Sequence, residues 1–181
     1  MNRDEMALLY EYNYWADWRI LDTAAKLTPE QFAAPAKYSR GGVRATLAHM
    51  LDGERTWRLI VSGSTAPRSS WATWPSGSTS LDVDEERVPT HEALMKFWRE
   101  DESEMRAYVG GLKQADFTEI VRFTTDDGQE IARVRWHCLV HVVNHGTQHR
   151  SEVAALLTGY GHSPGDLDFT QFLDEKTMAG A

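Results

Sequence analysis

The sequence contains a single cysteine, Cys138, in 181 residues, which excludes an intramolecular disulfide. Basic residues are also few, because 19 Lys and Arg stand against 27 Asp and Glu and give a formal net charge of −8. A surface of that sign does not neutralise phosphates, so nucleic acid is not an expected partner. No apolar run approaches the length of a membrane span, and the N-terminal stretch lacks the apolar core of a signal peptide. These absences predict a cytoplasmic protein that does not enter a membrane.

Several enzyme motifs are missing as well. The chain has no GxSxG, no P-loop and no dinucleotide-binding glycine pattern. The HExxH pattern of zinc proteases fails because Gly146 follows His145. Cys138 and His141 have the i, i+3 spacing of a nucleophile pair, but a lone thiol in an apolar helix is typical of a small core residue.

Apolar residues recurring at i, i+3 and i+4 predict four long amphipathic helices. These cover roughly residues 3–26, 43–62, 90–111 and 135–159. Residues 62–89 are rich in Ser, Gly, Thr and Pro but include Trp71 and Trp74, which favours a long crossover loop packed by its own rings over a substrate lid. One core and no repeat predict a single all-α domain over residues 1–181, a four-helix bundle with a long crossover loop.

Local signals place the smaller elements. Thr28 and Gln31 flank Pro29-Glu30 as a capping box, which predicts a short helical turn. Alternation over residues 120–135 around Asp127-Gly128 predicts a small β-hairpin before the last helix. The residues after Pro164 are expected to pack back on the bundle as a short tail.

Polar residues interrupt the apolar faces of two helices. Asn13 and Asp17 fall on the apolar stripe of the first helix; we interpret them as its solvent edge, the alternative being a polar site within the core. In the second helix, the inward face is predicted to include Glu54 and Trp57. Gly53 has no side chain and leaves room there for a ligand or a neighbouring helix.

Four of the seven histidines lie between residues 136 and 161, and His141, His145 and His149 recur at every fourth position. At about 100° per residue these three fall near one stripe of a helix. Two imidazoles four residues apart can reach the same small cation. His141 and His149 are separated by about 12 Å along the axis, so one ion is not expected to bridge all three. His145 and His149 are therefore the predicted metal-ligand pair.

A third ligand must come from elsewhere in the bundle. His91 stands at a helix start beside a loop, which makes it a poor core group, and His49 is the better candidate. Three histidines with an open fourth position form a catalytic zinc-type arrangement. The competing interpretation is structural, with histidines that only hydrogen-bond along a buried polar seam. His141 suits the role of a partner that orients a liganding histidine.

Glu152 falls on the same stripe as His149 and is the candidate catalytic residue. Three roles are open to its carboxylate: a fourth metal ligand, a general base, or an orienter of metal-bound water. The tryptophans are expected to line an apolar substrate pocket; they are Trp15, Trp57, Trp71 and Trp74.

A family resemblance rests on two motifs. The first is His49-Met-Leu-Asp-Gly-Glu54 with Trp57, and the second is Val143-Asn-His145-Gly-Thr-Gln-His149-Arg150. Together they resemble the DinB/YfiT-like family, bacterial proteins regarded as metalloenzymes. Asn13-Tyr14-Trp15 and Gly161-His162-Ser163-Pro164 extend the resemblance to nearly the whole chain. Ser151-Glu152 departs from the Gly-Gln that often follows His-Arg in the family, which changes the charge beside the ligands.

The resemblance implies an up-down four-helix bundle, often a homodimer, and a divalent ion, usually zinc or nickel, held by His49, His145 and His149. Characterised relatives transfer low-molecular-weight thiols or use them as cofactors in isomerisation. The sequence therefore predicts a metal-dependent enzyme that activates a thiol cosubstrate (S-transferase type) or water towards a small-molecule substrate. The alternatives are a non-catalytic protein with a structural or small-molecule-sensing metal, and a metal-free interaction module.

Overall fold

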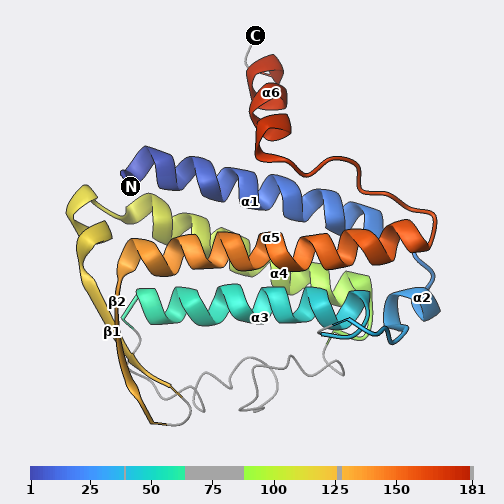
Figure 1. Cartoon of the computed structure of the whole chain (residues 1–181), viewed down its shortest axis with the longest axis horizontal. Coiled ribbons are helices and arrows are strands. Elements are labelled where there is room, and N and C mark those ends of the chain that lie inside the picture. The colour runs from blue at the N-terminus through green and yellow to red at the C-terminus, as the bar shows by residue number, and fades with distance from the viewer. Residues whose placement is uncertain (39, 64–87, 126–127, 180–181) are drawn as a thin grey trace.

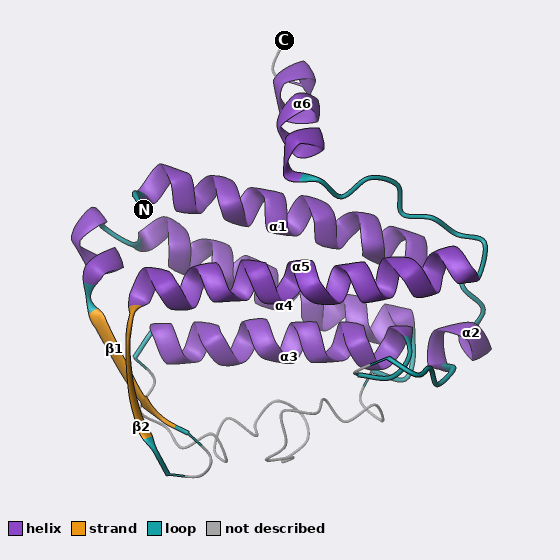
Figure 2. Ribbon diagram, viewed as in Figure 1, coloured by secondary structure: helices purple, strands orange, loops and turns teal. Residues whose placement is uncertain are grey.

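The structure is a computed structural model of the whole chain and describes residues 1–38, 40–63, 88–125 and 128–179. This part is mostly helical, with a small two-stranded antiparallel sheet (Figure 2). Four long helices lie side by side (Figure 1): α1 (Arg3–Ala24), α3 (Val43–Val61), α4 (His91–Gly111) and α5 (Arg135–Gly159). The four predicted helices are confirmed, with ends close to the predicted ones. No helix of the described ranges has the length and apolar character needed to cross a membrane.

The contacts between α3 and α4 show that these neighbours run in the same direction. Arg58 on α3 pairs with Asp101 on α4, and further along both helices the hydroxyl of Tyr108 donates to the carbonyl of Val61 at 2.7 Å. Helices α1 and α5 run the opposite way (Figure 1). The directions of the four long helices therefore do not alternate along the chain. The expected up-down order, which requires such alternation, is wrong.

Parallel neighbouring helices cannot be joined by a tight turn, because the chain must first return along the length of a helix. The connection between α3 and α4 is accordingly long in sequence. The predicted packing of that connection by Trp71 and Trp74 lies outside the described residues, which exclude 64–87.

Local side-chain caps start the helices where the sequence predicts. The Thr28 hydroxyl accepts from the backbone N–H of Gln31 at 3.2 Å, and the Gln31 side chain accepts from the N–H of Thr28 at 2.9 Å. This capping box opens the short helix α2 (Pro29–Ala33). The hydroxyl of Thr90 likewise accepts from the N–H of Ala93 at the start of α4.

The predicted hairpin is confirmed as β1 (Ile120–Thr124) and β2 (Glu130–Val134), which pair antiparallel. Its turn includes Gly128, whose φ of 84° is unfavourable for a residue with a side chain, whereas Asp127 lies outside the described residues. A short 3-10 helix, η2 (Gln114–Thr118), precedes the hairpin and was not predicted.

Strand β2 continues directly into α5, with no residue between them. The junction is fixed by Arg135, the first residue of α5. Its guanidinium donates to the carbonyls of Asp116 at 2.8 Å and Val61 at 3.3 Å, and to the carboxylate of Glu119 at 2.8 Å. One side chain therefore ties the hairpin base, η2 and the end of α3 to the start of α5.

The C-terminal residues pack back on the bundle as predicted, but they form a helix that was not predicted, α6 (Phe169–Ala179). Figure 1 shows α6 beginning beside α1 and projecting away from the four long helices. Phe172 is buried against the rings of Tyr12 and Trp15, and the Trp15 indole N–H donates to Glu175 at 2.9 Å. Trp15 thus serves the contact with α6, contrary to its expected place in a substrate pocket.

Two apolar clusters fill the interior, one toward each end of the long helices. The first includes Ile20, Leu47, Leu94, Val153 and Leu157, and the second includes Met6, Tyr10, Met105, Phe117 and Leu139. On every long helix, a polar residue falls between the positions that enter the two clusters. These residues are Asp17, Glu54, Asp101 and Arg150. Together with Asn13, which lies one turn before Asp17 and is hydrogen-bonded to it, we refer to them as the polar layer.

Candidate metal centre

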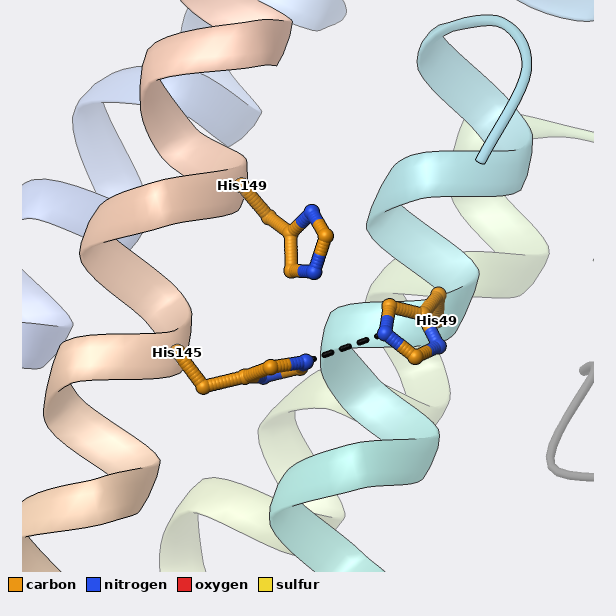
Figure 3. Close-up of side chains that lie close together, drawn as sticks. All are labelled: His49, His145 and His149. Atoms are coloured by element: carbon orange, nitrogen blue, oxygen red, sulfur yellow. Dashed lines mark hydrogen bonds between the residues drawn. The ribbon is translucent and has the colours of Figure 1, made fainter. Parts of the chain in front are cut away.

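Three histidine side chains from two helices converge beside the polar layer (Figure 3). His49 projects from α3, and His145 and His149 project from successive turns of α5. The Nε2 atoms of His49 and His145 lie 3.0 Å apart. One ring nitrogen from each of the three residues lies within 4.8 Å of the other two. The structure therefore brings together the three residues predicted as ligands.

The approach of His145 to α3 depends on Gly53. A Cβ atom at this position would lie 3.0 Å from Cε1 and 3.4 Å from Nδ1 of His145. Those distances are shorter than comfortable carbon contacts, so any side chain would displace the ring. The space predicted at Gly53 is confirmed, and a histidine from the neighbouring helix occupies it.

The nitrogen set fits a small divalent cation. Zinc binds imidazole nitrogen at about 2.0–2.1 Å, which places tetrahedral ligands about 3.3 Å from one another. The 3.0 Å separation of His49 and His145 is close to that value. Burial and the neighbouring histidines lower the pKa of His145 to about 3, so this imidazole is neutral at physiological pH. Neutral imidazole is the form that binds metals.

Glu152 contacts His149 on the side away from the other histidines. Its Oε2 lies 2.8 Å from Nδ1 of His149, whose side chain is buried. A carboxylate that accepts from Nδ1–H fixes the ring and directs Nε2 toward the metal position. His141 was expected to suit this orienting role, whereas Glu152 is the residue that contacts His149. The roles predicted for Glu152 itself remain predictions.

The other two candidate histidines lie outside the convergence. The His141 side chain is solvent-exposed, with its ring centroid 4.9 Å from that of Trp57 and 5.9 Å from that of His145. Within the described residues, no hydrogen bond joins His141 to the three converging rings. Nε2 of His91 lies 2.9 Å from the carbonyl of Leu21 and connects α4 to α1. Neither residue therefore joins the three ligands, as was expected for His141 from its distance along the helix and for His91 from its place at a helix start.

An ion pair crosses the polar layer directly behind the histidines. Arg150 is 1% exposed, and its Nη1 donates to Oδ1 of Asn13 at 2.7 Å and to Oδ1 of Asp17 at 2.8 Å. Asn13 and Asp17 are each 2% exposed, so their interpretation as a solvent edge is wrong and the alternative, a polar site in the core, is correct. The sequence analysis did not single out Arg150, although a cation beside His149 could have been matched to the carboxylate on the apolar stripe of α1.

Glu54 occupies the same layer and faces inward, as predicted. The hydroxyl of Tyr14 donates a short hydrogen bond to Oε1 of Glu54, and Nδ2 of Asn13 donates to Oε2 at 3.4 Å. Burial raises the pKa of the Glu54 carboxyl well above its ordinary value of 4.5, and the nearby carboxyls of Asp101 and Asp17 raise it further.

Comparison with known proteins gives two matches that span nearly the whole chain. A family model described as the DinB family matches residues 1–178. The curated protein named Protein DinB from Bacillus subtilis (strain 168) is 25% identical over 174 residues, which cover 94% of this chain and 96% of the relative. The family match includes both helices that carry the converging histidines.

Proposed function

The chain belongs to the DinB family, and from that membership and the geometry of the site we propose that it binds one divalent metal ion through His49, His145 and His149. The observation that carries the proposal is the convergence of three imidazole nitrogens within 4.8 Å. Two features support it: His145 is neutral at physiological pH, and His149 has a carboxylate partner at Nδ1. Zinc and nickel are the proposed ions, since imidazole suits both.

The proposed activity is that of a metal-dependent enzyme acting on a small-molecule substrate. Three protein ligands leave a coordination position for an exchangeable group. When bound, a divalent ion there favours thiolate over thiol, or hydroxide over water, at neutral pH. The protein would then be an S-transferase for a low-molecular-weight thiol or a hydrolase. Glu152 remains the candidate for proton transfer at this position.

Aromatic residues beside the histidines supply a surface for an apolar substrate. The Trp57 ring contacts His141 at 4.9 Å and Phe123 of β1 at 5.6 Å, measured between centroids. Both Trp57 and His141 have solvent access. A substrate held against these rings would lie next to His145, whose ring centroid is 5.9 Å from that of His141.

A non-catalytic metal-binding or small-molecule-sensing protein is the second candidate. The position of Glu152 favours it, because this carboxylate bonds to Nδ1 of His149, on the side away from the metal position, and so fixes a ligand without adding a reacting group there. A closed four-coordinate shell is typical of structural zinc rather than catalytic zinc.

Other parts of the proposal concern the whole molecule. We propose one domain over residues 1–181, built as a four-helix bundle in which α3 and α4 are parallel. The two apolar clusters support it, since each draws residues from all four long helices. A homodimer and a cytoplasmic location complete the proposal. Light scattering of the purified chain tests the first of these, and cell fractionation tests the second.

The decisive test is metal analysis of protein purified without chelator. Wild type is expected to carry about one ion per chain and to lose thermal stability in EDTA, because an ion that binds only the folded state stabilises it. His49→Ala should carry none, whereas His141→Ala, an exposed histidine next to the site, should retain the ion. Absence of stoichiometric metal together with an unchanged melting temperature in EDTA would reject metal binding.

Mass-spectrometric screening of thiols with model electrophiles then separates the enzyme from the binding protein, and equal turnover by His49→Ala would reject the enzyme.

A further inference from the structure

Glu54 is a partly buried carboxyl whose hydrogen-bond partners are both neutral. Tyr14 and Asn13 of α1 donate to its two oxygens. The other carboxylates of the polar layer differ, since Asp17 pairs with Arg150 at 2.8 Å and Asp101 pairs with Arg58. Among the described contacts of Glu54, no cation balances a charge on its carboxyl.

A small cavity connects Glu54 to the metal centre. Its lining includes Glu54, His145, Gly146, Asn13 and Asp17. The volume is about 10 Å³, comparable to the space that one water molecule needs. His145 therefore faces His49 with Nε2 and borders the cavity shared with Glu54 on its other side.

The charge of a divalent ion at this position needs compensation. Three neutral imidazoles leave its charge at +2, and a charge removed from water is stabilised only by a nearby opposite charge or by hydrogen bonds. Glu152 lies on the outer side, with 19% of its side chain exposed. On the inner side, Glu54 is the carboxyl that lines the cavity without a cationic partner among the described residues.

We propose that Glu54 is a positioning residue of the metal centre, which carries the buried counter-charge for the bound cation across the cavity and gives up its proton when the ion binds. The proposal rests on the proposed metal-binding function. The proton balance is simple: the neutral carboxyl becomes a carboxylate that accepts from Tyr14 and Asn13, and one proton leaves to solvent for each ion that binds.

Burial raises the pKa of the Glu54 carboxyl, and the groups around it disfavour a negative charge there in the same direction. Helix α1 presents Tyr10, Tyr14 and Asp17, helix α4 presents Asp101 and Glu102, and helix α5 presents His145 and Arg150. The acidic members of this set disfavour a further negative charge, and Arg150 is already bound to Asp17 and Asn13. Only a new positive charge changes that balance.

The experiment is calorimetric titration of zinc chloride into the metal-free full chain at pH 7, repeated in two buffers of different ionisation enthalpy. The dependence of the heat on the buffer gives the number of protons released per zinc. Wild type is expected to release about one proton more than Glu54→Gln, and the variant should bind zinc 10- to 100-fold more weakly, as loss of an orienting partner does. The control Glu100→Gln removes an exposed carboxylate from α4 and should match wild type in both quantities.

The outcomes separate the two proposals. If wild type binds zinc and Glu54→Gln binds it equally well with the same proton count, the role of Glu54 is rejected and the metal site stands. If wild type binds no stoichiometric zinc, both fail. Should Glu54→Gln not fold, Glu54→Asp provides the test, because it keeps an ionisable carboxyl and must still release the proton. Loss of that release in a folded Glu54→Asp protein would overturn the proposal. A purely structural Glu54 would change the melting temperature and leave the proton count alone.

Discussion

His49 and His145 approach each other to 3.0 Å between their Nε2 atoms, although 96 residues separate them in the chain. Both residues lie within long helices, away from any loop end. Their separation is therefore set by how α3 and α5 pack, which gives a rigid, preorganised pair. Small changes in that packing should alter metal binding before they alter folding.

Gly53→Ala tests this directly. The new Cβ would stand 3.0 Å from Cε1 of His145, so the ring must move by a few tenths of an ångström. Metal affinity is expected to fall by about tenfold, because a site needs its ligands within about 0.5 Å of the productive geometry. Competition with a chromophoric chelator measures the change.

The matched control is Gly110→Ala on α4, where a Cβ meets no atom within 4 Å. Both substitutions replace glycine by alanine in a helix, which by itself stabilises by up to about 1 kcal/mol. The control should gain that stability and keep the metal affinity of wild type. Equal affinities for the two variants would show that the Gly53 contact does not position His145.

Glu152→Ala removes the acceptor at Nδ1 of His149. We expect metal affinity to fall 10- to 100-fold, with Glu152→Gln intermediate because its amide oxygen can still accept. The exposed Glu100→Ala on α4 serves as control. If instead affinity is unchanged and only turnover is lost, Glu152 acts as the general base and does not orient His149.

Asp101 should make stability depend on pH. Burial raises its pKa from 3.8 to about 6, although Arg58 opposes the shift, and no hydrogen bond from the described residues reaches its Oδ2. Between these values the folded protein keeps a proton that the unfolded chain has released. The contribution of the protonated Asp101 carboxyl to the free energy of unfolding is therefore complete below about pH 4 and is lost as the pH rises through 6. The free energy of unfolding decreases by at most about 3 kcal/mol over this range.

Urea unfolding of wild type and Asp101→Asn between pH 4 and 7 measures this effect. The stability of wild type relative to the variant should decrease across the window, because the asparagine does not titrate. Glu100→Gln, which alters the exposed neighbouring residue, should follow wild type. Parallel curves for wild type and Asp101→Asn would contradict the prediction.

Elements defined by local signals were predictable from sequence. The four long helices follow from apolar periodicity, α2 and α4 start at the threonine caps, and the hairpin forms where residues alternate. His145 and His149 were also found, because i, i+4 spacing and the 1.5 Å rise limit which rings of one helix can meet, and His49 followed once His91 and His141 had been set aside. These rules need no knowledge of how the helices are arranged.

Features that depend on tertiary partners were not predictable in the same way. From the sequence alone, Asn13 and Asp17 resemble the solvent edge of α1, because their hydrogen bonds to Arg150 of α5 form only in the folded protein. The parallel direction of α3 and α4 depends on the path of a long connection that carries no local signal of direction. Helix α6 is short, with its buried contact made by Phe172 against α1, so packing determines its conformation more than propensity does.

The junction at Arg135 connects the hairpin rigidly to α5. Strand β2 enters the helix without a hinge residue, and the guanidinium binds three neighbouring segments. The strand forms a lever arm of about 17 Å, from five residues at about 3.4 Å each. A force or a contact at the hairpin would therefore be transmitted as a rotation of α5, the helix that holds two of the three histidines, and not be absorbed in a flexible loop.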